Sequence, residues 1–196
     1  MSVRLVLFGP PGAGKGTQAV RLAERLGVPT ISTGDIFRAN IAGDTELGRQ
    51  VVGYTSKGHL VPDELTDALI ADRLAQPDAA DGFLLDGYPR NGAQAAALDA
   101  LLAADDHELD LVIELAVDPD VVTARLLKRA QIEGRVDDTE DVIRHRLSVY
   151  AEQTSPLAEI YVNRGILAQV DGLGEVDEVT GRLLATIEQF TGELPQ

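Results

Sequence analysis

The sequence of 196 residues contains no cysteine and no tryptophan, a single methionine and only 4% aromatic residues. Without cysteine the chain has neither a disulfide framework nor a thiolate metal site. Its apolar runs are short, since none approaches the ~20 residues that a membrane-spanning helix needs. The N-terminal residues enter an apolar strand pattern without the layout of a signal peptide, so we expect a cytoplasmic protein with no membrane partner.

Positive charge is also scarce, with 17 lysines and arginines against 32 aspartates and glutamates and a net charge of −15. This charge would repel a nucleic acid, so we exclude one as a partner. Within 22 positions, however, the chain gathers six of its 17 basic residues: Arg125, Lys128, Arg129, Arg135, Arg144 and Arg146. Such a concentration in an acidic protein indicates a site for a small polyanion.

The rest of the composition, 44% hydrophobic and 25% charged, is typical of a globular protein, and the length predicts a single domain. No large exposed apolar stretch stands out in the pattern, so we expect a monomer.

Glycine is plentiful at one place, the run Phe8-Gly-Pro-Pro-Gly-Ala-Gly-Lys-Gly-Thr17. It follows the apolar residues 3–8 and leads into a helical pattern that begins near Lys15. A strand, a glycine-rich turn and a helix are the context of a phosphate-binding loop, in which backbone N–H groups and a lysine surround the phosphates. The general pattern places a serine or threonine directly after the lysine. Here Gly16 occupies that position and Thr17 follows, so we expect a magnesium ion to be held less directly.

Apolar strand patterns alternate with helical patterns along the whole chain. We predict strands at 3–8, 29–32, 83–86, 111–115 and 166–170, with helices at 15–26, 63–74, 91–104, 119–130, 139–161 and 176–190. Residues 36–57 look helical but broken by Gly43, Gly48 and Gly53, with Thr33 or Asp35 as the N-terminal cap. The fold class expected is α/β, a five-stranded, mostly parallel sheet covered by helices on both faces.

Four motifs occur in an order and spacing that resemble the adenylate kinase family. They are Gly9–Thr17, Ser32-Thr-Gly-Asp35 with Arg38, Asp86-Gly-Tyr-Pro-Arg90 with Gln94, and Arg135-Val-Asp-Asp138 with Arg146, and Tyr150–Leu157 also fits. The resemblance runs from residue 3 to about residue 188. It implies a P-loop NTPase-type core (1–32, 62–128 and 139–196), a helical AMP-binding insertion (33–61) and a lid at about 129–138. Because so few residues separate Arg129 from Arg135, the chain resembles the short-lid form of the family, without zinc.

The same resemblance implies phosphoryl transfer from ATP to AMP, giving ADP, and assigns the site residues. On the ATP side it places Gly12, Ala13, Gly14, Lys15, Gly16, Thr17, Arg129 and Gly174. On the AMP side it places Thr33, Arg38, Lys57, Gly58, Leu60, Val61, Gly87, Arg90, Gln94, Arg135 and Arg146. The catalytic set it implies is Lys15, Asp86, Arg90, Arg129, Arg135 and Arg146, with Thr33 and Gln94 at the adenine of AMP.

Asp86 ends an apolar strand, at the edge where open α/β sheets place their ligands, and we expect it to orient waters of a Mg²⁺ ion carried by ATP, near Thr17.

Three alternatives remain open. An arginine outside a motif can be a surface ion pair, the acceptor can be another monophosphate such as UMP or CMP, and the chain can be a nucleotide-dependent sensor without turnover. His59, His107 and His145 lack metal-like spacing and are expected to be ordinary surface residues. Asp137 and Asp138 are expected to be hinge and cap residues.

Overall fold

The computed structural model describes residues 3–133 and 139–192. Within them, five strands form one parallel sheet in the order β2-β3-β1-β4-β5. Their bounds are β1 Val3–Phe8, β2 Thr30–Ser32, β3 Gly82–Asp86, β4 Leu111–Ala116 and β5 Leu167–Asp171. The predicted α/β fold class is confirmed, and each strand lies within one or two residues of its predicted bounds.

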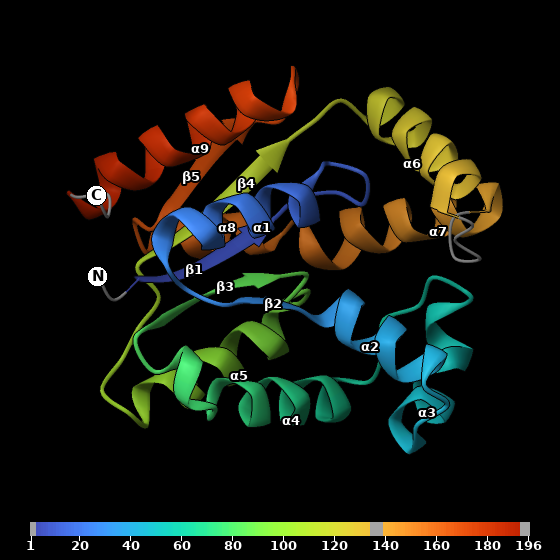
Figure 1. Cartoon of the computed structure of the whole chain (residues 1–196), viewed down its shortest axis with the longest axis horizontal. Coiled ribbons are helices and arrows are strands. Elements are labelled where there is room, and N and C mark those ends of the chain that lie inside the picture. Colours follow the sequence, from blue (N-terminus) through green and yellow to red (C-terminus); the bar gives the residue numbers. More distant parts are fainter. Residues whose placement is uncertain (1–2, 134–138, 193–196) are drawn as a thin grey trace.

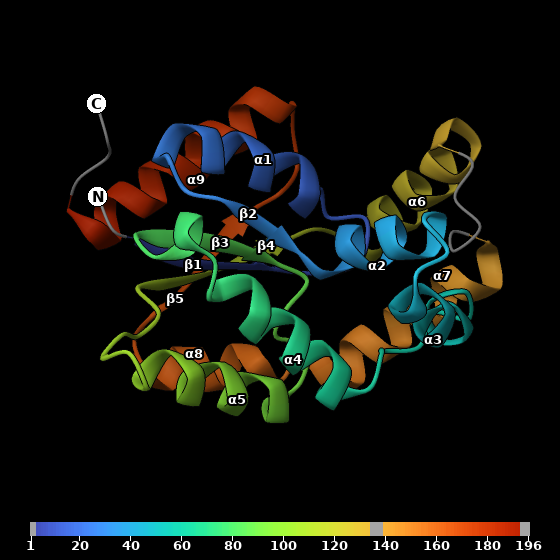
Figure 2. The same cartoon turned by 60° about the horizontal axis from the view of Figure 1, so that its bottom comes forward.

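Helices cover both faces of this sheet (Figure 2). On one face lie α1 (Lys15–Leu26) and α9 (Val176–Thr191), which enclose a core that includes Leu5, Leu22 and Leu183. On the other face lie α4 (Asp63–Leu74), α5 (Gly92–Ala103) and α8 (Leu157–Asn163), around Leu85 and Leu98. Strands β1 and β3 are buried along their full length, as expected of central strands in a sheet with two covered faces.

The segment after β2 forms two helices, α2 (Thr33–Ala42) and α3 (Glu46–Thr55), which pack around a small core of their own at Phe37 and Val51. The prediction of three glycine breaks was wrong in part, because only Gly43 separates the helices while Gly48 and Gly53 lie inside α3. A Cβ added at Gly48 would lie 2.2 Å from the carbonyl oxygen of Asn40. Gly48 therefore allows the close approach of α3 to α2 rather than interrupting a helix.

The cap of α2 is Ser32, whose hydroxyl accepts from the N–H of Asp35, and not Thr33 or Asp35.

The polypeptide after β4 forms α6 (Pro119–Glu133), α7 (Glu140–Val149) and a π-helical turn, η2 (Tyr150–Thr154), before α8. The long helix predicted over 139–161 is therefore not regular: the backbone widens at η2, and Pro156 directly precedes α8. A short 3₁₀ turn, η1 (Pro77–Ala79), lies between α4 and β3. Within residues 3–133 and 139–192, no helix has the length and apolar character needed to cross a bilayer.

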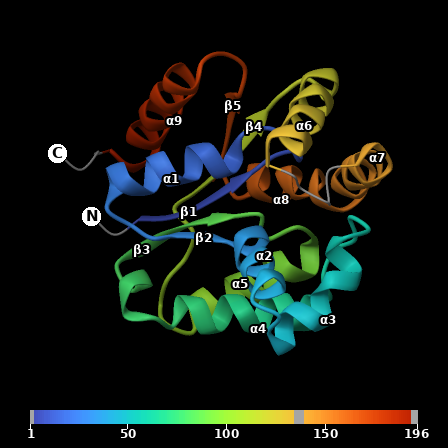
Figure 3. The same ribbon diagram turned by 45° about the vertical axis from the view of Figure 1, so that its right-hand side comes forward.

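Figures 1 and 3 show α2 and α3 on one side, and α6 and α7 on the other, beyond the carboxyl ends of the strands. The turn at Gly58 meets α7, because a Cβ added there would lie 2.8 Å from Cγ of Arg146 and 3.2 Å from Val142. The space between these elements is thus bounded on both sides, and it is where a ligand of the sheet edge would lie.

Candidate active site

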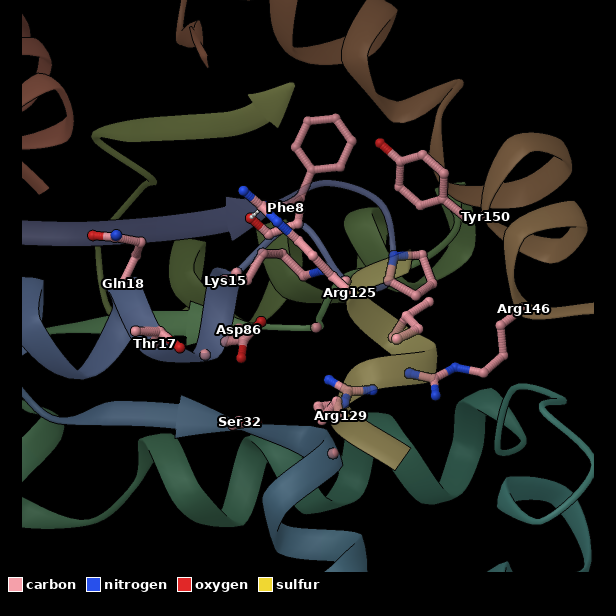
Figure 4. Close-up of a pocket in the computed structure, with 18 of the residues that line it drawn as sticks. Phe8, Lys15, Thr17, Gln18, Ser32, Asp86, Arg125, Arg129, Arg146 and Tyr150 are labelled. Atoms are coloured by element: carbon pink, nitrogen blue, oxygen red, sulfur yellow. Dashed lines mark hydrogen bonds between the residues drawn. The ribbon is translucent and has the colours of Figure 1, made fainter. Parts of the chain in front are cut away.

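Two cavities open at the carboxyl end of the sheet. The first, about 730 Å³, is bounded by the glycine-rich loop, the end of β3, α6 and α7 (Figure 4). The second, about 360 Å³, lies between α2, α3, the turn 58–61 and the start of α5. The residues that line both cavities are Gly34, Arg38, Gly58, Leu60, Gly87, Arg90 and Arg146. Since three of these are arginines, the two cavities meet at a strongly positive junction.

The glycine-rich loop has the geometry of an anion-binding loop. Gly9 has a φ of +145°, and a Cβ there would lie 2.7 Å from the carbonyl oxygen of Leu115, so only glycine fits. Lys15, at the first turn of α1, bends back so that its Nζ donates to the carbonyls of Gly9 (2.8 Å) and Pro10 (3.0 Å). Burial lowers the pKa of Lys15 to about 8; Asp86 opposes this shift, and Arg90, Arg146 and Arg129 add to it.

Asp86 ends β3 and is buried beside the start of α1. Burial raises the pKa of its carboxyl, whereas Lys15 and Arg90 lower it and Asp35 raises it further. A Cβ added at Gly16 would lie 3.6 Å from Oδ2 of Asp86, so a serine or threonine at position 16 would contact this carboxylate. The glycine keeps the space between Asp86 and the loop open, and Thr17 lies on the same side of the cavity (Figure 4).

The arginines come from four different elements. Arg90 follows β3, where its Nε donates to the carbonyl of Gly87 (2.6 Å) and its carbonyl accepts from Thr154 (2.7 Å). Burial lowers the pKa of Arg90 to about 10, and Arg146 and Arg38 contribute while Asp86 opposes them. Figure 4 shows Arg129 of α6 and Arg146 of α7 pointing into the first cavity. The lowered pKa values show that these cations are held close together and away from water, at a cost in free energy. A bound anion would offset this cost, so the arrangement is typical of an anion-binding site.

A polar network closes the inner end of the second cavity. Gln94 is buried; its Oε1 accepts from the N–H of Arg90 (2.8 Å) and its Nε2 donates to Asp63 (2.8 Å). The hydroxyl of buried Thr33 donates to the carbonyl of Gly87 (3.0 Å). Apolar side chains of Phe37, Ile41 and Val52 line the remainder of this cavity. A flat apolar group with a polar edge fits such a space.

Comparison with known proteins identifies the family of this chain. A family model for adenylate kinase matches residues 7–166. The chain is 58% identical to an adenylate kinase of Kocuria rhizophila over 186 residues, covering 95% of this chain and 99% of that protein. It is 55% identical to one from Thermobifida fusca, with coverage of 95% and 98%, and 53% identical to one from Micrococcus luteus, with coverage of 98% and 95%.

The chain belongs to the adenylate kinase family. The resemblance seen in its motifs is thereby confirmed. The structure also shows which of the residues carried over from the family lie together. The glycine-rich loop, Lys15, Thr17, Asp86, Arg129 and Gly174 line the first cavity; Thr33, Val61 and Gln94 line the second.

Two residues assigned from the adenylate kinase motifs are not brought to the site by the described structure. Lys57 is exposed and lines neither cavity, although its neighbours in the turn, Ser56, Gly58, His59, Leu60 and Val61, line the second one. Arg135, together with Asp137 and Asp138, lies outside the described residues.

Sequence reasoning missed several residues of the site. Arg125 lines the first cavity and joins two loops, because its guanidinium donates to the carbonyls of Ala13 and Gly172, each at 3.3 Å. Its place in the basic cluster was the signal that could have found it. Tyr150 and Thr154 reach the cavity from the π-helical turn; they belong to the segment Tyr150–Leu157, which fits the family motifs, but no site role was assigned to them. His59 lies at the surface as expected, but its ring also contacts that of His145, with Nδ1 and Nε2 2.9 Å apart, which the sequence did not indicate.

Proposed function

We propose that this protein transfers a phosphoryl group reversibly from ATP·Mg²⁺ to AMP, giving two ADP, with ATP in the first cavity and AMP in the second. Membership of the adenylate kinase family supports this reaction. The observation that carries it is the junction of the two cavities, where Arg38, Arg90 and Arg146 line both spaces. A protein that binds one nucleotide needs only one cavity, whereas direct transfer needs two that meet at the reacting phosphates.

The residues act by position and charge. In-line phosphoryl transfer requires little covalent chemistry of the protein, so the loop and the arginines align the donor and acceptor and neutralise the charge of the transferring group. Lys15 and Arg129 face the triphosphate, Arg38 and Arg90 the phosphate of AMP, and Arg146 lies between them. We assign Arg135 the same role as Arg146, on the basis of its motif.

Base selectivity follows from the hydrogen bonds already made inside the protein. The proton of the Thr33 hydroxyl goes to Gly87, so Thr33 offers a lone pair to the ligand. The amide nitrogen of Gln94 keeps one N–H beyond its bond to Asp63. An acceptor beside a donor matches the 6-amino group and N1 of adenine, while guanine and uracil present the opposite pattern. Cytosine offers the same pair of groups, so CMP is the competitor that the size of the cavity must reject.

The residues near the loop fit Mg²⁺. The carboxylate of Asp86 and the hydroxyl of Thr17 are hard oxygen donors beside the phosphate site, and Gly16 leaves room for water between them. Bound with ATP, the ion would neutralise phosphate charge, and Asp86 would orient its waters. We further propose that the enzyme needs no zinc and no nucleic acid, and acts as a monomer in the cytoplasm. Segments 33–61 and 129–138 would close over the substrates and exclude water.

A coupled assay of ADP formation tests the reaction with AMP, GMP, UMP and CMP as acceptors. We expect turnover with AMP, and a preference for CMP or UMP would overturn the assignment of the acceptor. A ligand that joins two adenosines through five phosphates tests the two adjoining cavities, since one molecule would span both. It should bind far more tightly than ATP or AMP alone, because one association replaces two. Binding no tighter than ATP would favour a sensor with a single nucleotide site.

A further inference from the structure

Two of the three histidines in the chain are in contact beside the second cavity, which His59 lines. His59 lies in the turn after α3 and His145 in α7, 86 residues further along the chain. Nδ1 of His59 and Nε2 of His145 are 2.9 Å apart, and the rings meet edge to face with centroids separated by 4.5 Å. Their meeting depends on Gly58, whose lack of a side chain lets α7 approach the turn.

We propose that His59 and His145 form a binding site for a divalent transition-metal ion, of the class Ni²⁺, Cu²⁺ or Zn²⁺. Imidazole nitrogen is a ligand that these ions prefer, whereas Mg²⁺ prefers oxygen. Two nitrogens held about 2.1 Å from one ion lie about 3.0 Å apart at a right angle and about 3.4 Å apart at the tetrahedral angle. The observed separation therefore already suits two ligands of a single ion, at the right-angled end of this range.

Binding requires a small rearrangement of protons and rings. The proton now shared between the two nitrogens would move to the other nitrogen of its own ring, leaving two neutral imidazoles that each present a lone pair. One ring must also turn about its χ2 angle so that both lone pairs meet at the ion. His59 is exposed, so its ring has room to do so.

Water would complete the coordination. Among residues 3–133 and 139–192, no group of three or more His, Asp or Glu side chains could hold a metal, so the protein supplies two ligands here. The site is therefore one of moderate affinity that responds to added metal, unlike a structural zinc centre.

An ion held by both rings would also join two parts of the molecule. His59 lines the second cavity and belongs to the turn that follows α3, while His145 belongs to α7. Metal binding would therefore favour the arrangement in which this turn lies against α7. If this arrangement is the closed one, metal binding should slow the release of nucleotides and inhibit turnover, and this consequence rests on the proposed function. The metal site itself does not depend on that function.

Calorimetric titration with Ni²⁺, in excess Mg²⁺ to saturate oxygen sites, tests the proposal. We expect one equivalent to bind to the unaltered protein, and His59→Asn and His145→Asn each to weaken binding about tenfold or more. His107→Asn is the matched control, since His107 is exposed and distant in sequence from both; its binding should equal that of the unaltered protein. Unchanged affinity in both variants, or an equal loss in the control, would overturn the site.

A second measurement on the unaltered protein avoids any dependence on how the variants fold. Cu²⁺ below one equivalent should broaden the ring-proton resonances of His59 and His145 and leave those of His107 sharp. Broadening of all three rings alike, or of none, would contradict the site. The two-adenosine ligand provides the link to function: it should tighten Ni²⁺ binding, because each ligand favours the same arrangement. Specific metal binding without this coupling would leave the site standing and refute only the inferred closure.

Discussion

Replacing Lys15 with methionine should separate the stability of this protein from its activity. In the structure without ligand the ammonium group donates to two loop carbonyls, while burial and three arginines oppose its charge. The charged ammonium group of Lys15 is therefore destabilised in the protein without ligand, and bound phosphates would stabilise it. Methionine keeps the length and the apolar stem but removes the charge, so it isolates the electrostatic cost.

The magnitude follows from the pKa of Lys15, which falls from 10.5 to about 8. A fall of this size corresponds to about 3 kcal/mol of destabilisation of the charged form, and partial exposure reduces it to about 1–3 kcal/mol. Loss of the two hydrogen bonds would cost about 1–2 kcal/mol. The free energy of unfolding of Lys15→Met at neutral pH should therefore lie within about 1–2 kcal/mol of the unaltered protein, with stabilisation as the favoured sign.

The dependence on pH is the sharper expectation. Below about pH 8 the ammonium is charged in the folded and unfolded states, so the full cost is present. Above about pH 10.5 it is neutral in both states and the cost is gone. Between these values the unfolded state binds more protons, so the unaltered protein gains stability relative to Lys15→Met as pH rises.

Denaturant unfolding of both proteins across this pH window measures the difference directly, and Lys57→Met controls for loss of a surface charge. The coupled assay should show a loss of about 10²–10³ in kcat for Lys15→Met, since the charge stabilises the transferring phosphates. A stability difference that stays constant with pH, or a destabilisation above about 3 kcal/mol at neutral pH, would refute the electrostatic account. Turnover close to that of the unaltered protein would refute the role of Lys15.

Three further expectations concern the metal, the insertion and the base. A chelator should stop the reaction but leave the melting temperature of the nucleotide-free protein unchanged, and a large drop would reveal a structural metal. Gly48→Ala should destabilise the protein by about 1–3 kcal/mol or more, because its Cβ would meet the backbone of Asn40. Gly53 has open space around it, so Gly53→Ala should stabilise α3 by about 0.5–1 kcal/mol. Equal effects of the two substitutions in thermal unfolding would contradict the close packing of α2 and α3. Gln94→Ala should weaken AMP as an acceptor by about 1–3 kcal/mol and leave the affinity for ATP unchanged, while an equal loss for both nucleotides would indicate a general defect in folding.

The sequence by itself determined the parallel sheet, the phosphate-binding loop and the family. These features depend on local patterns: short apolar runs bounded by turns, glycines at fixed offsets from Lys15, and a carboxylate at the end of the third strand. Each is encoded within about ten neighbouring residues, and a parallel sheet brings the ends of its strands to one edge, so local patterns were sufficient to place Lys15, Asp86 and Arg90 together.

Tertiary structure alone decided which separate elements touch. Gly48 looks like a helix break in the sequence, but it is the contact between α2 and α3, and Arg125 looks like one basic residue among six until its bonds to Ala13 and Gly172 are seen. His59 and His145 show no spacing that pairs them, since 86 residues separate them and the turn at Gly58 brings them together. Contacts of this kind depend on how whole helices pack, and a pattern of neighbouring residues carries no information about the distance between their side chains.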